Sequence, residues 1–459
     1  MMFFSRSWVS RLNRRQSFAR FSSASDSWKT TGRISGFELS SGEAIEAMHL
    51  KFLKKFAAAA LYIGLACTGY AQDAPASKST DQPQGSNQSA APAATPAPDS
   101  AAPTPLPTPA ITGPPQAALP MNIEAGPLGK LSLNGVVSGI GLFQNNTVAG
   151  NNGAEGAFSN AQVFFQKADG WFQFYVQAGA YDIVSLGSPF ISNAKTNDDL
   201  WGPVPVAYAK LVPAKNTNLL IGILPTLMGA EYTFDFQNMN IERGLLWNQE
   251  NAITRGVQIN QTLGKFTASF SWNDGYYSNR YSGLSGALTY TNGPHSLTFS
   301  GMGYLGQTAW QNLATPLQNN STMYVAEYTY TKGKWIVQPY LQYSDVPTNP
   351  AIGVVHGAST WGGAILASRT LKRGLSLTGR WEYIGSTGNA AQQAVNLMYG
   401  PGSAAWSITM TPTYQYKKFF TRTDISFVQA NNFTPGDAFG SFGTKGSQTR
   451  GVVELGFLF

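Results

Sequence analysis

The sequence predicts an all-β fold: a transmembrane antiparallel β-barrel of about 16 strands over residues 128–459, preceded by a disordered Pro/Ala-rich N-terminal arm. Three observations predict it. Only 12% of the residues are charged, against roughly 25% in an ordinary soluble domain. Beyond residue 127, apolar and polar positions alternate in segments typical of strands. The connections between these segments are alternately tight and long, a pattern that a soluble β-sandwich does not need but a membrane barrel does.

Residues 48–71 are predicted to be a secretory signal peptide. A basic segment precedes an apolar run over 56–67, and a small-x-small cleavage site follows directly before Gln72. A short membrane anchor is one alternative, although the apolar run is shorter than the ~20 residues that a spanning helix needs. Acylation at Cys67 is another, although Gly64 stands where a lipoprotein signal usually has a large aliphatic residue.

Residues 1–47 are basic and Ser-rich, and they resemble a mitochondrial transit peptide only superficially. Because a bacterial-type signal follows, we expect a misassigned N-terminal extension, with Met48 as the initiator. Residues 1–72 carry ten Lys/Arg and four Asp/Glu, so +6 of the net charge of +7 lies in this part. The basic pI therefore gives no reason to expect nucleic acid binding.

Residues 72–127 are predicted to be a Pro/Ala-rich periplasmic linker. Twelve prolines fall between positions 73 and 120, among Ala, Ser, Thr and Gln. Such a segment cannot bury enough apolar surface to offset its ordering entropy, so we expect an extended, semi-rigid tether.

The alternating segments begin with residues 130–143 and end with 447–459. In the last one, Val453, Leu455, Phe457 and Phe459 share one face. The terminal Phe459 resembles the C-terminal signal that barrel-assembly machinery reads in bacterial outer-membrane barrels. The predicted strands are 130–143, 157–168, 171–182, 204–213, 217–228, 252–261, 264–273, 281–291, 295–305, 321–331, 334–343, 358–370, 373–384, 404–416, 419–430 and 447–459.

Seven of the connections have the chemistry of tight turns. They are Asp169-Gly170, Lys215-Asn216, Leu263-Gly264, Asn292-Gly293, Lys332-Gly333, Lys372-Arg373 and Lys417-Lys418. The other connections are long and alternate strictly with the tight ones. From a periplasmic N-terminus, this arrangement places the turns in the periplasm and the long loops outside.

The two faces of the predicted strands differ in polarity. Every backbone amide must be paired in lipid, so a closed barrel with an apolar outer face is the expected solution. Aromatic belts are predicted at Trp171 or Phe172, Trp272, Tyr290, Trp335, Tyr343, Trp361 and Tyr416. The predicted inward residues are largely polar and include Gln162, Gln166, Gln173, Gln177, Gln338, Gln342, Thr409, Thr411 and Thr413.

Three places in the barrel resemble the OmpL-like family of β-barrel porins. They are residues 160–169 with Trp171 and 180–183; Gly229-Ala230-Glu231 with Asn240 and Glu242-Arg243; and Asn273-Asp274-Gly275 after the strand that follows Arg255-Gly256-Val257. The resemblance spans the barrel and implies an outer-membrane channel without catalytic residues.

Seven charged residues are predicted to line the pore: Glu327, Arg380, Glu382, Arg422, Asp424, Arg450 and Glu454. Opposed charges across a pore create a transverse field that selects polar solutes. The alternative is that neighbouring charges are solvated ion pairs of little consequence.

The third long loop, residues 229–251, is the predicted constriction. Its candidate residues are Glu231, Asp235, Glu242 and Arg243. By analogy with general porins, this loop could enter the lumen and give a modest preference for cations; packing over the rim is the alternative.

An enzyme is not expected, because His295 lies at a predicted turn and His356 in a long loop, so no inward histidine could act as a base. One cysteine and three histidines also argue against a metal site, and no cofactor is expected.

The sequence predicts a passive diffusion porin for small hydrophilic solutes in a bacterial outer membrane. Its partners would be membrane lipid and the barrel-assembly machinery, with a homotrimer and a monomer both open. The alternative is a structural or adhesive barrel with an occluded lumen and a cell-wall-contacting arm.

Overall fold

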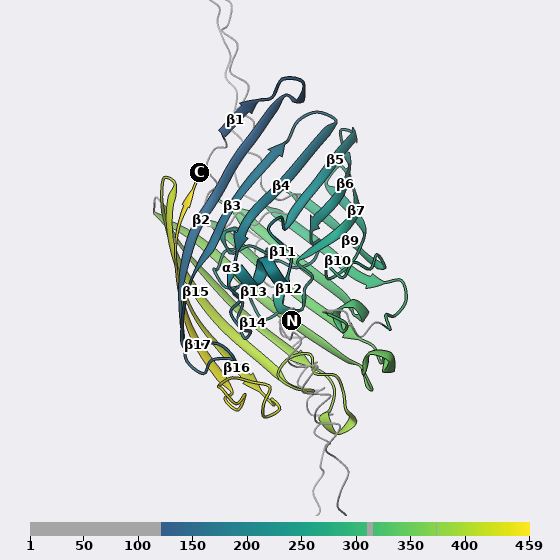
Figure 1. Ribbon diagram of the computed structural model, residues 1–459, viewed down its shortest axis with the longest axis vertical. Coiled ribbons are helices and arrows are strands. Elements are labelled where there is room, and N and C mark those ends of the chain that lie inside the picture. Colours follow the sequence, from purple (N-terminus) through teal and green to yellow (C-terminus); the bar gives the residue numbers. More distant parts are fainter. Residues whose placement is uncertain (1–120, 310–314, 373) are drawn as a thin grey trace, which may run out of the picture. The chain divides into compact units, whose positions relative to one another are not determined.

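A closed antiparallel barrel of 16 strands dominates the computed structural model, which describes residues 121–309, 315–372 and 374–459 (Figure 1). The expectations on the N-terminal extension, the signal peptide and most of the linker lie outside the described residues. No helix in the described ranges is long and apolar enough to cross a membrane.

The barrel strands follow one another in sequence around the wall. They are β2 (Lys130–Gln144), β3 (Ala154–Lys167), β4 (Phe172–Tyr181), β5 (Val206–Ala214), β6 (Thr217–Pro225), β7 (Ile253–Leu263), β8 (Phe266–Asn273), β9 (Gly283–Asn292), β10 (His295–Tyr304), β11 (Thr322–Lys332), β12 (Trp335–Val346), β13 (Ala358–Lys372), β14 (Leu375–Ser386), β15 (Ala404–Tyr416), β16 (Phe419–Asn431) and β17 (Ser447–Leu458). The last strand closes the barrel by pairing with β2, with Leu455 opposite Gly139.

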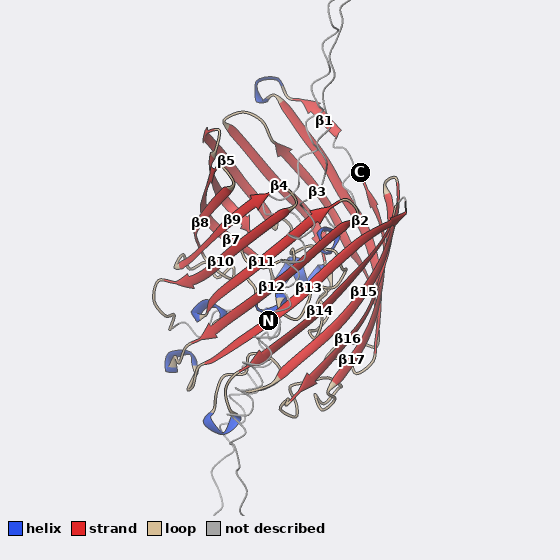
Figure 2. Ribbon diagram, turned by 180° about the vertical axis from the view of Figure 1, so that it is seen from behind, coloured by secondary structure: helices blue, strands red, loops and turns tan. Residues whose placement is uncertain are grey.

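The connections alternate as the sequence predicts. The tight turns gather at the end of the barrel that holds the C-terminus, and the longer loops lie at the other end (Figure 2). In an outer-membrane barrel the short turns face the periplasm. This assignment gives the wall a periplasmic end, near Lys417 and Phe459, and an extracellular end.

All of the predicted strands are present, and their ends differ by a few residues. β3 begins at Ala154 and β12 continues to Val346, so both are longer than predicted. β6 is shorter, because it ends at Pro225 rather than at residue 228. Proline has no N–H to donate to a ladder, and one further bond, from the N–H of Thr226 to the carbonyl of Ala252 at 3.1 Å, follows it before the third long loop.

One short strand lies where the sequence predicted only linker. β1 (Met121–Glu124) pairs with the start of β2, and the 3-10 helix η1 (Gly126–Leu128) connects them. All four residues of β1 are exposed, so the strand is held by backbone pairing and not by burial. A prediction from composition cannot detect such a strand, because its side chains bury nothing.

The predicted faces are confirmed. Among the inward residues, Gln162, Gln177, Gln338 and Thr411 are buried. Trp272, Trp335, Tyr343 and Tyr416 are exposed on the outer surface, as aromatic belts require.

Two long connections leave the wall and fill the interior. The second long loop, residues 182–205, carries the short helix α3 (Asn193–Asp199), which contacts β3 and β4. The third long loop, residues 229–251, carries the 3-10 helices η2 (Asp235–Gln237) and η3 (Trp247–Gln249). These two loops provide the candidate functional site.

Candidate functional site: a loop locked to the charged wall

The third long loop lies inside the barrel. It bonds to β3 on one side, to β12 on another and to β14, β15, β16 and β17 along a third. A loop over the rim could not reach all of these strands, so the loop lies among the inward side chains of the wall. That it forms the constriction of a pore stays a prediction. The loop residues Glu231, Asp235, Glu242 and Arg243 are all buried.

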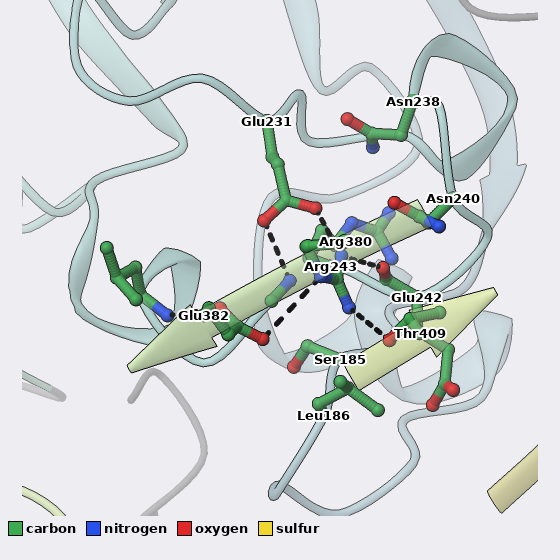
Figure 3. A network of polar contacts seen from close by, with 12 residues as sticks. Ser185, Leu186, Glu231, Asn238, Asn240, Glu242, Arg243, Arg380, Glu382 and Thr409 are labelled. Atoms are coloured by element: carbon green, nitrogen blue, oxygen red, sulfur yellow. Dashed lines mark hydrogen bonds and ion pairs between the residues drawn. The ribbon is translucent and has the colours of Figure 1, made fainter. Parts of the chain in front are cut away.

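Arg380 on β14 holds the start and the middle of the loop together. Its Nη1 donates to Oε1 of Glu231 at 2.6 Å and to the backbone carbonyl of Glu242 at 2.6 Å. Nη2 donates to the hydroxyl of Thr409 on β15 at 3.2 Å. Figure 3 shows the guanidinium surrounded by these partners. A fixed fork of donors suits this bridging of loop and wall.

Glu382, two residues further along β14, binds the loop backbone. Its Oε2 accepts the N–H of Leu245 at 2.7 Å, and its Oε1 accepts the hydroxyl of Ser407 at 2.5 Å. The loop can approach this closely because residue 244 is glycine, where an added Cβ would overlap Oε2 of Glu382. The N–H of Gly244 donates to Glu231 at 2.8 Å.

Arg450 on β17 joins both loops to the wall. Its Nη1 lies 3.0 Å from Oε1 of Glu242 and donates to the carbonyl of Ser185 at 2.9 Å, while Nη2 donates to the carbonyl of Ser188 at 3.0 Å. Glu242 also accepts the hydroxyl of Ser426 at 2.7 Å. The second and third long loops are thus fixed to the same arginine.

The neighbouring strand β16 adds two further contacts. Asp424 accepts the N–H of Glu242 at 2.8 Å. Arg422 pairs with Glu454 through Nε at 2.9 Å and donates to the carbonyl of Asn238 at 3.2 Å. On the other side of the lumen, Asn160 of β3 donates to Asp235 at 2.6 Å.

Arg243 belongs to the loop itself and ties it to the second long loop. Its Nη1 donates to the carbonyl of Val184 at 2.8 Å, Nη2 donates to the carbonyl of Thr233, and the guanidinium lies 5.3 Å from the ring centroid of Trp247. The backbone carbonyls of the two loops are therefore satisfied by one fully buried arginine.

Two buried loop carboxylates have no such partners. Neither oxygen of Asp182 or of Glu250 makes a hydrogen bond within the described residues. Burial raises the pKa of Glu250 well above its usual range, and the nearby carboxyls of Glu231 and Glu327 raise it further. Burial and the neighbouring Asp235 raise the pKa of Asp182 in the same way. Both carboxyls are thereby biased toward the neutral form.

The predicted wall charges are inward and buried, but they do not face each other across open water. Arg380, Arg422 and Arg450 contact Glu231, Glu454 and Glu242 directly. Glu327 differs, because its partners are uncharged wall residues: Thr329 at 3.0 Å, and Gln338. It is the one charged side chain on the inward faces of β6 to β12 in the described part of the chain.

The inward faces of β7 to β10, across the barrel from the charged strands β14 to β17, carry no charged side chain among the residues that the structure describes. Inward residues of β7 to β10 bond to one another across strands: Thr262 to Thr267 at 3.2 Å, Asn273 to Ser285 at 2.9 Å, and Thr289 to Thr298 at 3.0 Å. We call this surface the neutral wall. Its inward polar residues are Gln258, Asn260, Thr262, Thr267, Ser269, Ser271, Asn273, Ser285, Thr289, Thr291, Ser296, Thr298 and Ser300.

The remaining predicted residues have clear positions. Val453, Leu455, Phe457 and Phe459 share the outward face at the end of the chain, where the rings of Phe457 and Phe459 are stacked at 6.1 Å. His295 starts β10, with Nδ1 2.7 Å from the hydroxyl of Tyr328, and His356 is exposed in a loop.

The second long loop also contributes to the site, although none of the predicted site residues lies on it. Ser185 and Ser188 supply carbonyls to Arg450, and Asp182 adds a buried carboxyl. The apolar run Ile183-Val184 with Leu186 was an available signal, because an exposed loop seldom carries three large aliphatic residues so close together.

A sequence profile described as "Putative beta-barrel porin-2, OmpL-like" matches residues 130–459. The search of curated protein sequences gave no match. Among solved structures, OmpT, an outer membrane protein of Vibrio cholerae, has 11% identity and a TM-score of 0.50, covering 74% of this chain and 100% of that chain. The outer membrane channel DcaP of Acinetobacter baumannii has 11% identity and a TM-score of 0.48, covering 72% and 97%. Salmonella typhi OmpF, in complex with daunomycin, has 13% identity and a TM-score of 0.47, covering 74% and 100%. At these identities the likeness concerns the fold alone.

Proposed function

Because this chain belongs to the beta-barrel porin-2, OmpL-like family of the bacterial outer membrane, we propose that it is a passive diffusion channel for small hydrophilic solutes. The observation that carries the proposal is the neutral wall. A face of hydroxyl and amide groups can exchange hydrogen bonds with water and with uncharged polar solutes without holding them tightly.

The ion-paired side of the lumen, formed by β14 to β17, supports the same proposal. The charges of β14 to β17 are bonded to the loops or, for Glu454, to Arg422 of the wall, so a solute passing between loop and neutral wall meets few free charges. We therefore propose weak ion selectivity, with Glu327 as its main source. In this proposal the selectivity does not come from a transverse field between an acidic loop and a distant basic wall.

A second candidate function has its own support. The loops bring apolar side chains into the lumen, where Leu186, Phe234, Ile241 and Leu246 are almost completely buried. A barrel with its interior filled in this way could serve a structural or adhesive role with no open passage.

Planar-bilayer conductance separates the two functions, because an occluded barrel gives no stable open steps. Site-directed thiol labelling then locates the conduction path. It uses a Cys67→Ser background, because Cys67 is the only cysteine. Ser269→Cys lies on the neutral wall, and its neighbour Phe270→Cys, at a position 52% exposed on the outer face, is the matched control.

A charged, water-soluble thiol reagent should reduce the conductance of the Ser269→Cys barrel and leave that of the Phe270→Cys barrel unchanged. Stable steps that the reagent affects in neither variant would place the path elsewhere. No steps in any variant would favour the occluded barrel.

A further inference from the structure

A groove of about 580 Å³ lies on the outer surface of the barrel, across β15, β16, β17, β2 and β3. It spans the seam where the last strand pairs with the first strand of the barrel. Its lining is almost entirely apolar and includes Gly139, Phe158, Tyr414, Tyr416, Phe419 and Phe457.

The register of the strands explains the depression. One row across the wall runs Tyr414, Thr421, Leu455, Gly139 and Phe158, each opposite the next. The small residues at the second and fourth positions stand between large ones, so the surface sinks there. The glycine is not required by the backbone, because a Cβ at position 139 would make only an ordinary contact, 3.4 Å from the carbonyl of Ala157.

Two lysines lie at the periplasmic mouth of this groove. The turn between β15 and β16 is Lys417-Lys418, next to the lining residues Tyr416 and Phe419. Nζ of Lys417 lies 5.4 Å from the ring centroid of Tyr416, and Nζ of Lys418 lies 5.9 Å from that of Phe457. Among the described residues neither lysine has an ion-pair partner, so both charges are available to an anion.

We propose that this groove binds one phospholipid with an anionic headgroup from the periplasmic leaflet. Its acyl chains would lie along Gly139 and Thr421, and its phosphate between the two lysines. Lipid surrounds this face of an outer-membrane barrel, and buried CH₂ groups and basic residues both contribute to lipid binding. A second copy packed against the same face about a twofold axis would instead bring two lysine pairs together, which disfavours such a dimer.

Native mass spectrometry of the detergent-extracted protein tests this with two lipids of equal chains, phosphatidylglycerol and zwitterionic phosphatidylethanolamine. The unmodified protein should retain phosphatidylglycerol preferentially. Lys417→Ala with Lys418→Ala should weaken that binding by about 30-fold, the effect expected for two basic residues near a membrane surface. Lys332→Ala with Lys334→Ala, at another periplasmic turn, is the matched control and should change little.

A second experiment fills the groove with a larger side chain. Gly139→Leu should reduce the binding of both lipids, while Gly156→Leu, on the same outer wall with only a 3.9 Å contact to its Cβ, should not. Heat-modifiable gel migration shows that each variant is folded. Phosphatidylglycerol binding that survives both the lysine and the Gly139 substitutions would overturn the proposal. So would loss of an oligomer in Gly139→Leu without any change in lipid binding, because the groove would then be a subunit interface.

Discussion

Arg450 on the last strand and Glu242 in the third long loop lie 3.0 Å apart inside the barrel, although 208 residues separate them in sequence. The same arginine binds the carbonyls of Ser185 and Ser188, so one wall residue fixes both internal loops. The stability of the loops and the composition of the lumen therefore depend on a small set of buried ion pairs.

Removing one partner of the Arg450–Glu242 pair should destabilise the folded barrel. Arg450→Met leaves the carboxylate of Glu242 buried without its partner, and we expect the free energy of unfolding to fall by about 3–5 kcal/mol. The double variant Arg450→Met, Glu242→Gln should recover part of the loss. Urea unfolding of the refolded barrel measures both. Lys167→Met, which breaks a pair whose Asp169 is 65% exposed, is the control and should change little.

Gly244→Ala should loosen the third long loop without touching a charge. The added methyl group would displace Glu382 from the N–H of Leu245, and a hydrogen bond to a charged group is worth about 1.5–3 kcal/mol. We expect faster proteolytic cleavage within 229–251 and noisier single-channel traces. Gly156→Ala, whose Cβ would meet nothing closer than 3.9 Å, is the control. Cleavage at the rate of the unmodified protein would show that the loop tolerates the displacement.

Glu327→Gln should change ion selectivity. This carboxylate is inward and lies outside the loop-binding cluster, so its removal should shift the reversal potential toward anions under a salt gradient. The shift should shrink as the Debye length falls from ~10 Å at 0.1 M salt to ~3 Å at 1 M. Glu124→Gln, on the exposed strand β1, should have no effect. An unchanged reversal potential for Glu327→Gln would remove this residue from the conduction path.

Glu250 should make stability depend on pH. Its pKa is raised in the folded protein, so the folded state holds a proton that the unfolded chain releases above the usual value of 4.5. The free energy of unfolding from this group is therefore highest in acid and falls as pH rises above 4.5. Glu250→Gln should flatten the fall in urea-unfolding experiments across this range. A slope equal to that of the unmodified protein would exclude Glu250 as its source.

Phe459→Ala should reduce the amount of folded barrel in the outer membrane. Phe459 stacks on Phe457 at 6.1 Å, and its backbone pairs with Gly135 at 2.9 and 3.0 Å. The heat-modifiable fraction in isolated membranes measures assembly. Phe442→Ala, which removes a loop aromatic that is 83% exposed, should assemble normally. Equal yields of the two variants would show that the terminal ring is not needed.

The strands could be predicted because each carries its own evidence. In β14, Leu377 and Trp381 alternate with Thr378 and Arg380, and the period of two fixes both the strand and its inward face. The strand ends were less certain, as at Pro225, because pairing beyond the last apolar residue depends on the neighbouring strand.

The contacts of the site could not be predicted in the same way. Alternation shows that Arg380 and Glu382 point inward, but not that the carbonyl of Glu242 and the N–H of Leu245 meet them. Those partners lie on a loop without a sequence period. The loop composition, acidic and aromatic, was a usable signal for entry into the lumen, whereas the pairing depended on distances across the fold.

The location of these contacts has a consequence for the order of folding. Arg422 and Arg450 lie on the last two strands, so the internal loops cannot be secured until the C-terminal end of the chain reaches the wall. Contacts between residues so distant in sequence form slowly, because the intervening chain must first be confined. Once formed, they hold β16 and β17 from within, next to the seam with β2. A partly assembled barrel would therefore have internal loops without their wall contacts and a sheet with unpaired edges. Both would change together when β16 and β17 dock and β17 pairs with β2.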